Sequence, residues 1–324
     1  MTPSTRCQPV VIFEGPDAGG KSTAAQLYAK AIDGLYVHHA PYLYVKHGLA
    51  RVYLESMLPA LMGYQPVVLD RSWLSEPIYG SVMRQGHDRI GLVHRRMLER
   101  AALRCGAMVI NCLPPWPCVD QTYQRRHATE YVNTKTKMKQ VYNIYTQLAQ
   151  QTDLSVTQFS YVKHPSKAQT LAAIRTFLTG ASTPHLTSCR SAGALNAKIV
   201  LVGDQLAEVK AHDNLYQLPF ISWSNHGCSS WLTAQLAKTG LKETQLLYVN
   251  AHDQSIINFF AQFTQTDLTR KQFIALGSAA STALTRQGIK HLLVPHPQHW
   301  KRFQAQHEYP LLSLITQKGA LQQC

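Results

Sequence analysis

A glycine-rich segment near the start of the chain has the residue types and the spacing of a phosphate-binding loop. The run from Gly15 to Ser22 fits the pattern G-x-x-x-x-G-K-[ST]. Glycines in such a loop let backbone N–H groups point at phosphate oxygens, while the lysine reaches the β- and γ-phosphates and the hydroxyl ligates Mg²⁺. We therefore expect ATP and Mg²⁺ as cofactors. The expected nucleotide-binding residues are Gly15, Gly19, Gly20, Lys21, Ser22 and Thr23.

The segments on either side of this loop support the interpretation. Residues 8–13 form a short apolar run of the kind found in a buried parallel strand. Residues 22–30 contain good helix formers and no helix breaker. Strand, glycine loop and helix is the context that favours a P-loop over a chance match.

An acid and a base follow a second apolar run, at residues 66–70. Asp70 ends the run and Arg71 follows it, so both are expected at the carboxyl end of a strand. An aspartate there holds Mg²⁺ through water, and an arginine there grips an acceptor phosphate in a bidentate manner. A structural ion pair is the alternative.

Asp17 places a carboxylate inside the loop itself. A negative charge among phosphate-binding groups is awkward unless it faces the acceptor, where it can orient or deprotonate a hydroxyl. Glu14, immediately before the loop, is the alternative acid, and a loop-bracing role for Asp17 is the third interpretation.

Two further arginine groups are candidates for substrate contacts. Arg125 and Arg126 follow the proline-rich residues 114–117 and suit a mobile lid that closes over ATP, although a solvated helix face is the alternative. Residues 84–104 carry six arginines on a predicted helix and its approach, with Leu92 among the side chains expected to point inward. We expect that group to be a nucleic-acid patch or a solvated face. The candidate DNA or substrate contacts within it are Arg84, Arg95 and Arg96.

Composition favours a polyanionic partner. The 324 residues include 32 Lys and Arg against 18 Asp and Glu, a net charge of +14, and 21 of the basic residues precede residue 191. DNA or RNA would use that excess, although a generally basic soluble surface is the alternative. No apolar run approaches the ~20 residues of a membrane helix. The seven cysteines include no C-x-x-C pair, so we expect neither a zinc site nor a disulfide framework. A reducing cytoplasm is then the expected location, or the host cytoplasm if the protein is phage-encoded.

The chain divides into two predicted domains. Small and polar residues cluster at 178–193, and a new apolar run begins near residue 197. We expect a P-loop domain over 1–180, a linker over 181–196 and a second α/β domain over 197–324. In the first domain, predicted strands at 8–13, 66–70, 107–113 and 158–162 alternate with helices, the pattern of a doubly wound parallel sheet.

The first half resembles the thymidylate kinase family, whose P-loop reads close to F-E-G-x-D-G-A-G-K-S-T and whose second signature begins D-R-Y. This chain has Phe13 to Thr23 and Asp70-Arg71-Ser72 at the matching positions. The resemblance implies that Asp17 faces the acceptor hydroxyl, Arg71 the acceptor phosphate, and the two lid arginines the donor. Two departures put free dTMP in doubt as the acceptor. This chain has Ala18-Gly19-Gly20 where the family has Gly-Ala-Gly, and Gly80 stands where a glutamine is expected near thymine.

The second half is similar to the uracil-DNA glycosylase superfamily, through short stations at 203–207, 219–220, 276–280 and 296–298. The resemblance implies a three-layer α/β domain that recognises a base or DNA. Because Gly203 to Ala207 and His296-Pro297-Gln298 depart from the G-E-x-P-G and H-P-S stations, glycosylase activity is not expected. The implied contact residues are Asp204, Asn250 and His296. An unrelated α/β domain is the alternative.

Together these features predict an ATP-dependent kinase acting on a thymine-type pyrimidine. The pairing of domains and the charge resemble phage-type 5-hydroxymethyl-deoxyuridine DNA kinases, in which a base hydroxymethyl accepts the phosphate for thymine hypermodification. The alternatives are a dTMP or dNMP kinase with an accessory domain, and a nucleotide-regulated DNA-binding protein or altered glycosylase. The expected partners are ATP and DNA, with a homodimer also open and no membrane.

Overall fold

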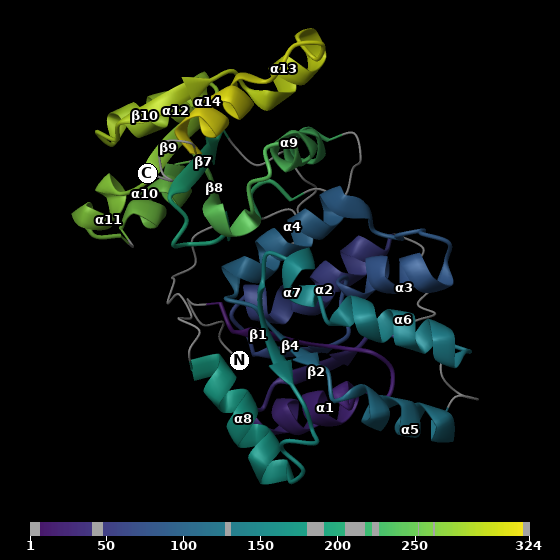
Figure 1. The fold of residues 1–324 in the computed structure, drawn as a ribbon. Helices are drawn as coiled ribbons and strands as arrows, with labels where there is room; N and C mark the ends of the chain where they lie inside the picture. Colours follow the sequence, from purple (N-terminus) through teal and green to yellow (C-terminus); the bar gives the residue numbers. More distant parts are fainter. Residues whose placement is uncertain are drawn as a thin grey trace. The chain divides into compact units, whose positions relative to one another are not determined.

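The computed structural model describes residues 7–40, 48–126, 131–179, 191–204, 218–221, 227–251, 253–261 and 263–319. The chain forms two compact units, residues 1–185 and 186–324 (Figure 1). Each unit is an α/β layer structure built on its own five-stranded sheet.

The first unit contains a fully parallel sheet in the order β2-β3-β1-β4-β5. Its strands are β1 (Val10–Glu14), β2 (Leu35–His38), β3 (Val67–Asp70), β4 (Met108–Cys112) and β5 (Ser155–Phe159). Its helices are α1 (Lys21–Ala31), α2 (Leu49–Leu61), α3 (Ser75–Met83), α4 (Gly91–Arg104), α5 (Trp116–Arg126), α6 (Lys135–Tyr145), α7 (Leu148–Gln151) and α8 (Lys167–Thr179).

The central strand β1 is buried along its whole length, because helices cover both faces of the sheet. Helices α1 and α8 lie on one face and α2 and α4 on the other (Figure 1). On the first face, Phe13, Tyr28 and Phe159 belong to one apolar core. This packing holds the carboxyl ends of β1 and β3 side by side, with Ile12 opposite Leu69 in the sheet register.

The structure differs from the sequence prediction at three places in this unit. Strand β5 ends at Phe159, so residues 160–162 lie beyond it. The sequence pattern did not indicate β2, a short strand at the edge of the sheet. The arginine face expected on α4 is not solvated: the exposed fractions of Arg96 and Arg100 are 8% and 0%, while Leu92, expected inward, is 54% exposed. From Arg96 to Ala102 every residue of this helix is buried, so the amphipathic pattern does not define a surface there.

The second unit has a sheet in the order β10-β9-β7-β8-β6. Its strands are β6 (Ser191–Gly193), β7 (Ile199–Gly203), β8 (Leu246–Asn250), β9 (Gln272–Leu276) and β10 (His291–Val294). Its helices are α9 (Cys228–Ala237), η3 (Glu243–Gln245), α10 (Asp253–Phe260), α11 (Gln265–Thr269), α12 (Ser278–Arg286), α13 (Pro297–Phe303) and α14 (Pro310–Gly319).

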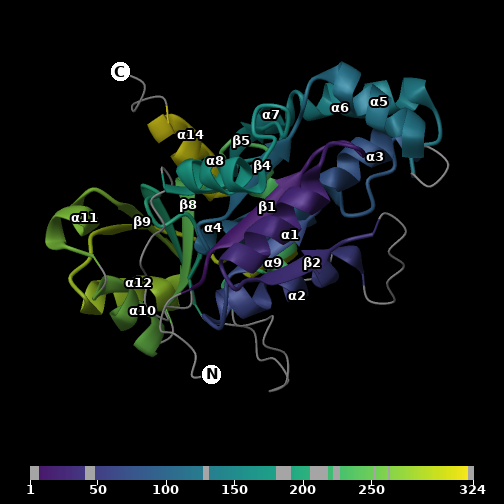
Figure 2. The ribbon, with the colours of Figure 1, turned by 90° about the horizontal axis from the view of Figure 1, so that it is seen from below.

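All strand pairs in the second sheet are parallel except the edge pair β6 and β8. Helices α10 and α12 lie together on one face of this sheet (Figure 2). Strand β6, at residues 191–193, is part of the second sheet and falls within the predicted linker. Residues 181–190 of that linker lie outside the described part of the chain. No helix among the described residues of either unit is long and apolar enough to span a membrane.

Candidate phosphoryl-transfer site

The loop from Gly15 to Gly20 joins β1 to α1 and wraps over the end of the sheet. Gly15 has a φ of 141°, and a Cβ at this position would overlap the carbonyl oxygen of Cys112 on β4. Gly20 has a φ of 83°, and a Cβ there would lie 2.7 Å from the Tyr161 ring. These two positions need glycine both for the left-handed backbone and for the close approach of neighbouring groups. The backbone is therefore arranged as an anion-binding loop requires.

Lys21 begins α1 and is buried, with an exposed fraction of 6%. Its Nζ donates to the carbonyl oxygen of Pro16 at 3.2 Å and lies 3.8 Å from Asp17 Oδ1. Burial lowers the pKa of Lys21, and the charge of Arg71 adds to that effect, while nearby carboxylates oppose it. The ammonium group thus sits at the loop where a phosphate would neutralise it.

Asp17 and Arg71 form a buried ion pair. The guanidinium carbon of Arg71 also lies 4.8 Å from the centre of the Tyr79 ring. Arg71 has a positive φ of 72°, which is uncommon for a residue with a side chain and is concentrated at functional sites. The second carboxylate oxygen of Asp17, Oδ2, is buried with no hydrogen-bond partner. The loop carboxylate therefore keeps one oxygen available to a ligand.

Asp70 ends β3 and has no exposed surface. Its Oδ2 accepts from Tyr36 Oη at 2.7 Å and lies 2.8 Å from His38 Nδ1, both on β2. Burial alone would raise the pKa of Asp70, but Lys21 and the Ser22 hydroxyl outweigh it, so the pKa is lowered and the carboxylate is charged. Its other oxygen, Oδ1, is buried and has no hydrogen-bond partner.

An unpartnered carboxylate oxygen beside the Ser22 hydroxyl fits a hard cation that takes oxygen ligands, as Mg²⁺ does. No cluster of three or more His, Cys, Asp or Glu side chains suited to a metal occurs in the described part of the chain. In nucleotide sites, substrate phosphates complete the coordination of Mg²⁺, so few protein ligands are needed there. The residues that would hold it are Ser22 and Asp70.

Glu14, the alternative acid, is fully engaged. Its Oε1 accepts from the backbone N–H and the hydroxyl of Ser72 at 2.8 and 2.7 Å. Its Oε2 accepts from Ser75 Oγ at 2.7 Å and from Tyr145 Oη at 3.0 Å. Burial raises the pKa of Glu14, and these donors only partly compensate. Glu14 thus braces β1 against the start of α3, and Asp17 is the better candidate for the reacting acid.

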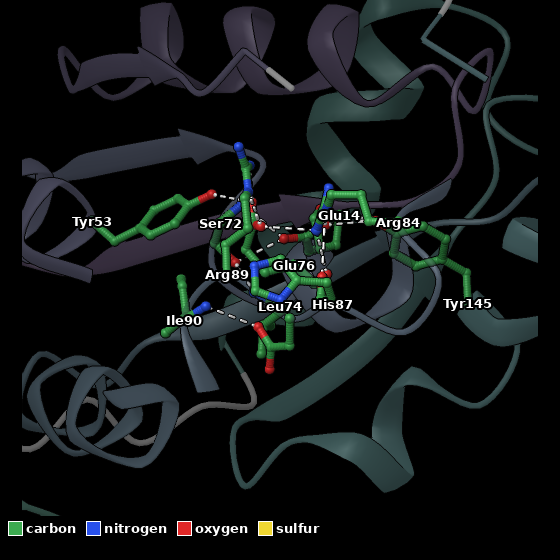
Figure 3. Close-up of polar contacts among 12 residues, drawn as sticks. Glu14, Tyr53, Ser72, Leu74, Glu76, Arg84, His87, Arg89, Ile90 and Tyr145 are labelled. Atoms are coloured by element: carbon green, nitrogen blue, oxygen red, sulfur yellow. Dashed lines mark hydrogen bonds and ion pairs between the residues drawn. The ribbon is translucent and has the colours of Figure 1, made fainter. Parts of the chain in front are cut away.

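A pocket lies beside Arg71 and is built around Glu76 on α3. Arg89 forms a two-point ion pair with Glu76 at 2.6 and 2.7 Å, and Arg84 Nη2 lies 3.0 Å from Glu76 Oε2. Tyr53 Oη donates to Glu76 Oε1 at 3.2 Å. Figure 3 shows Tyr53 and the arginines approaching the same carboxylate. The pocket has a volume of about 20 Å³, and its lining residues are His39, Ala40, Tyr53, Arg71, Ser75, Glu76, Tyr79, Arg84, Arg89 and Tyr131.

The other arginines singled out from the sequence lie outside this pocket. Arg95 pairs with Asp88 at 3.2 Å, and Arg96 is buried in α4, so neither belongs to an open nucleic-acid surface. Arg125 and Arg126 are exposed in the last turn of α5. Residues 127–130, the continuation of the expected lid, lie outside the described residues, so the lid stays a prediction.

In the second unit, the predicted contact residues gather at the carboxyl ends of parallel strands. His296 Nε2 lies 3.8 Å from Asp204 Oδ2, and Asp204 Oδ1 accepts from the Ala280 N–H at 3.0 Å. Asn250 ends β8 opposite Gly203 on β7. Ligands of open α/β sheets bind at such strand ends, close to where the strand order reverses. Gln205 to Ala207, which the resemblance placed in the same site, lie outside the described part of the chain.

Sequence reasoning missed the residues that β2 contributes. Tyr36, His38 and His39 come from this unpredicted strand and its end, and all three reach Asp70 or the pocket. The available signal was a short apolar run that ends in a histidine pair, because carboxyl ends of parallel strands meet at one edge of the sheet. The sequence analysis also assigned no role to Glu76, on which the pocket arginines converge.

No family model matches the chain, and no curated protein matches it. Three of the solved structures that are similar to the chain each cover about half of it. The YorR protein from Bacillus subtilis, in complex with phosphorylated GDP, is 15% identical with a TM-score of 0.42, covering 52% of this chain and 95% of its own. Deoxyadenosine kinase from M. mycoides with bound dCTP is 13% identical with a TM-score of 0.35, covering 53% and 99%. Thymidylate kinase from Candida albicans is 11% identical with a TM-score of 0.36, covering 55% and 93%. Likeness at this level does not define a family for this chain.

Proposed function

We propose that the chain is an ATP-dependent phosphotransferase whose acceptor is the base hydroxymethyl of 5-hydroxymethyl-deoxyuridine in DNA. The observation that carries the transferase assignment is the meeting of Lys21, Asp17 and Asp70 at the carboxyl ends of β1 and β3. Two of these groups keep a buried carboxylate oxygen without a partner. Such unpartnered charged groups are costly unless a ligand or ion engages them.

The roles follow from the surroundings of each group. The loop N–H groups and Lys21 would hold the phosphates of ATP, and Asp70 with Ser22 would hold Mg²⁺, which supplies charge neutralisation on the transferred phosphoryl group. Asp17 would accept or orient the acceptor hydroxyl proton through its unpartnered Oδ2. Arg71 would orient Asp17 and, on release from it, stabilise negative charge at the reacting oxygens.

The choice of a base in DNA depends on three features. The net charge of +14 favours a polyanionic substrate. The second unit brings Asp204 and His296 together at a strand-end site suited to recognition of a base. In the first unit the pocket arginines Arg84 and Arg89 are engaged by Glu76, so they are not displayed as a clamp for an acceptor monophosphate. A dTMP or dNMP kinase remains the second candidate, favoured by Arg71 at the pocket wall.

One labelling experiment separates the two candidates. The purified protein is incubated with γ-labelled ATP and either free dTMP or duplex DNA containing 5-hydroxymethyluracil. We expect label to enter the DNA. Label found only in dTMP would overturn the DNA assignment and leave the transferase assignment intact.

The variant Lys21→Ala tests the transferase assignment itself. We expect it to abolish label transfer to either acceptor, because the loop would lose the buried ammonium group that holds the ATP phosphates. Among the described residues of the site, Lys21 supplies the only such group. Thermal unfolding of the variant serves as the control for folding. Transfer at the wild-type rate would show that the loop is not the ATP site.

A further inference from the structure

His39 occupies a position that neither the motifs nor the mechanism above explains. It follows β2 directly, and its backbone N–H donates to the carbonyl oxygen of Asp70 at 3.1 Å. Its exposed fraction is 4%, and its ring centre lies 4.6 Å from that of Tyr53. The ring nitrogen Nε2 is buried and has no hydrogen-bond partner. The His39 side chain is therefore buried, and its Nε2 atom has no hydrogen-bond partner.

An imidazole nitrogen offers one hydrogen bond, as donor or as acceptor according to the tautomer. The unpartnered Nε2 of His39 therefore has capacity for one hydrogen bond to a polar edge of a ligand. Burial, followed by the charge of His38, lowers the pKa of His39 to about 4, and Asp70 opposes that shift.

Tyr79 contributes a second unsatisfied polar atom to the same pocket. Its hydroxyl is buried and has no hydrogen-bond partner, and the Arg71 guanidinium lies over its ring. The cationic groups of the wall are already engaged, Arg71 by Asp17 and Arg89 by Glu76. Two polar atoms of the wall, His39 Nε2 and Tyr79 Oη, therefore have no hydrogen-bond partner.

The size of the pocket limits what can enter. A volume of about 20 Å³ holds about one water-sized group. It admits the polar edge of a ligand and not a whole ring. Because Arg71 both lines the pocket and binds Asp17, that edge would lie next to the proposed reacting acid.

We infer that His39 is a specificity-determining residue, which hydrogen-bonds through Nε2 to a polar edge of the acceptor, with the Tyr79 hydroxyl as the second contact. The inference rests on the proposed phosphotransferase function and adds a residue to its acceptor site. For a base in DNA that edge is the imide of the base, and for a free nucleotide it is the imide or the sugar hydroxyl.

The decisive variant is His39→Phe, which keeps an aromatic ring against Tyr53 and removes both ring nitrogens. Steady-state rates are measured with γ-labelled ATP and whichever of dTMP or 5-hydroxymethyluracil DNA the wild type phosphorylates. We expect the acceptor KM to rise by about tenfold, the effect of one lost hydrogen bond. The KM for ATP should not change. His39→Gln, whose amide reaches the region of Nε2, should restore part of the affinity.

The matched control is His94→Phe, on α4. His94 Nδ1 lies 3.2 Å from the carbonyl oxygen of Ile90, and His94 does not line the pocket. We expect its acceptor KM to equal that of the wild type. Thermal unfolding of all variants shows whether each is folded, and His39→Gln keeps the test decisive if the phenylalanine variant is not.

Acceptor analogues identify the edge that is contacted. One analogue, for either acceptor, carries a methyl group on N3 of the base, and the other, for a free nucleotide acceptor only, lacks the 3′-hydroxyl of the sugar. For the analogue that lacks the contacted group, wild type and His39→Phe should have the same acceptor KM, because the hydrogen bond is already absent in both.

The outcomes separate the two levels of the proposal. A wild type that phosphorylates neither acceptor would overturn the proposed function. A wild type that is active, with His39→Phe and His39→Gln both folded and unchanged in acceptor KM, would overturn the role of His39 alone.

Discussion

Two carboxylates three residues apart show how surroundings decide chemistry at the scale of the residue. Glu14 accepts four hydrogen bonds and is closed off. Asp17 has one oxygen on Arg71 and one without a partner. Residue type does not distinguish them, but the number of donors around each does. We therefore propose Asp17, and not Glu14, as the acid that takes the proton from a substrate.

This contrast predicts the effect of Asp17→Asn. An amide cannot act as a base and weakens the contact with Arg71, so we expect kcat to fall by about 10² to 10⁴-fold. The KM for ATP should stay close to the wild-type value, because Lys21 and the loop backbone are retained. Turnover close to that of the wild type would assign the reacting acid elsewhere.

His39 predicts how stability depends on pH. Its pKa in the folded protein, about 4, lies below the ordinary value of 6.5. The unfolded chain therefore binds a proton first, so the stability that neutral His39 contributes is complete above pH 6.5 and is lost as the pH falls toward 4. The difference amounts to about 3 kcal/mol at full loss.

The measurement is denaturant unfolding of the wild type and of His39→Phe at neutral and at acidic pH. The variant lacks the titrating group, so we expect its unfolding free energy to fall less on acidification. Equal losses in the two proteins would mean that His39 titrates normally in the folded state.

At the scale of the element, the loop between β1 and α1 is defined by what surrounds it. Its backbone conformation is set by Gly15 and Gly20, and the atoms that crowd these glycines belong to β4 and to Tyr161, beyond β5. The loop therefore has its shape only when the sheet is assembled in the order β3-β1-β4-β5. Helix α4 gives the converse lesson, because its polar residues are buried by packing that its own periodicity does not reveal.

Gly15→Ala tests this dependence. The added methyl group would overlap the carbonyl oxygen of Cys112, so β4 or the loop must shift. We expect phosphoryl transfer to fall below a tenth of the wild-type rate and the melting temperature to drop. Gly288→Ala is the matched control, because Gly288 also has a positive φ, 68°, but has open space around it. That control should lose about 1 kcal/mol of stability and no activity.

At the scale of the whole molecule, charge and domain pairing bear on the substrate. Both units are net basic, with 20 basic and 11 acidic residues up to position 185 and 12 and 7 after it. The positions of α4 that the sequence suggested for DNA are buried or paired, so the basic surface must come from other residues.

This charge predicts a dependence of the rate on salt. Each phosphate contact with DNA releases counterions, so transfer to 5-hydroxymethyluracil DNA below saturation should fall steeply as salt increases. The rate with a free acceptor, or the affinity for ATP, should change much less and provides the control. A DNA rate that is insensitive to salt would count against a DNA substrate.

The sequence by itself determined the P-loop, its lysine, the Asp70-Arg71 pair and the alternating α/β pattern, because these depend on local spacing and on runs of apolar residues. Only the tertiary structure distinguished the surroundings of Glu14 from those of Asp17, revealed the contribution of β2, and buried the arginines of α4. Those outcomes depend on which strands become neighbours and on how many donors surround a group, and neither is encoded in a short window of sequence. His39 illustrates the difference: the sequence shows a histidine pair, whereas the fold buries one of the two rings in the pocket that Arg71 lines and leaves its Nε2 without a hydrogen-bond partner.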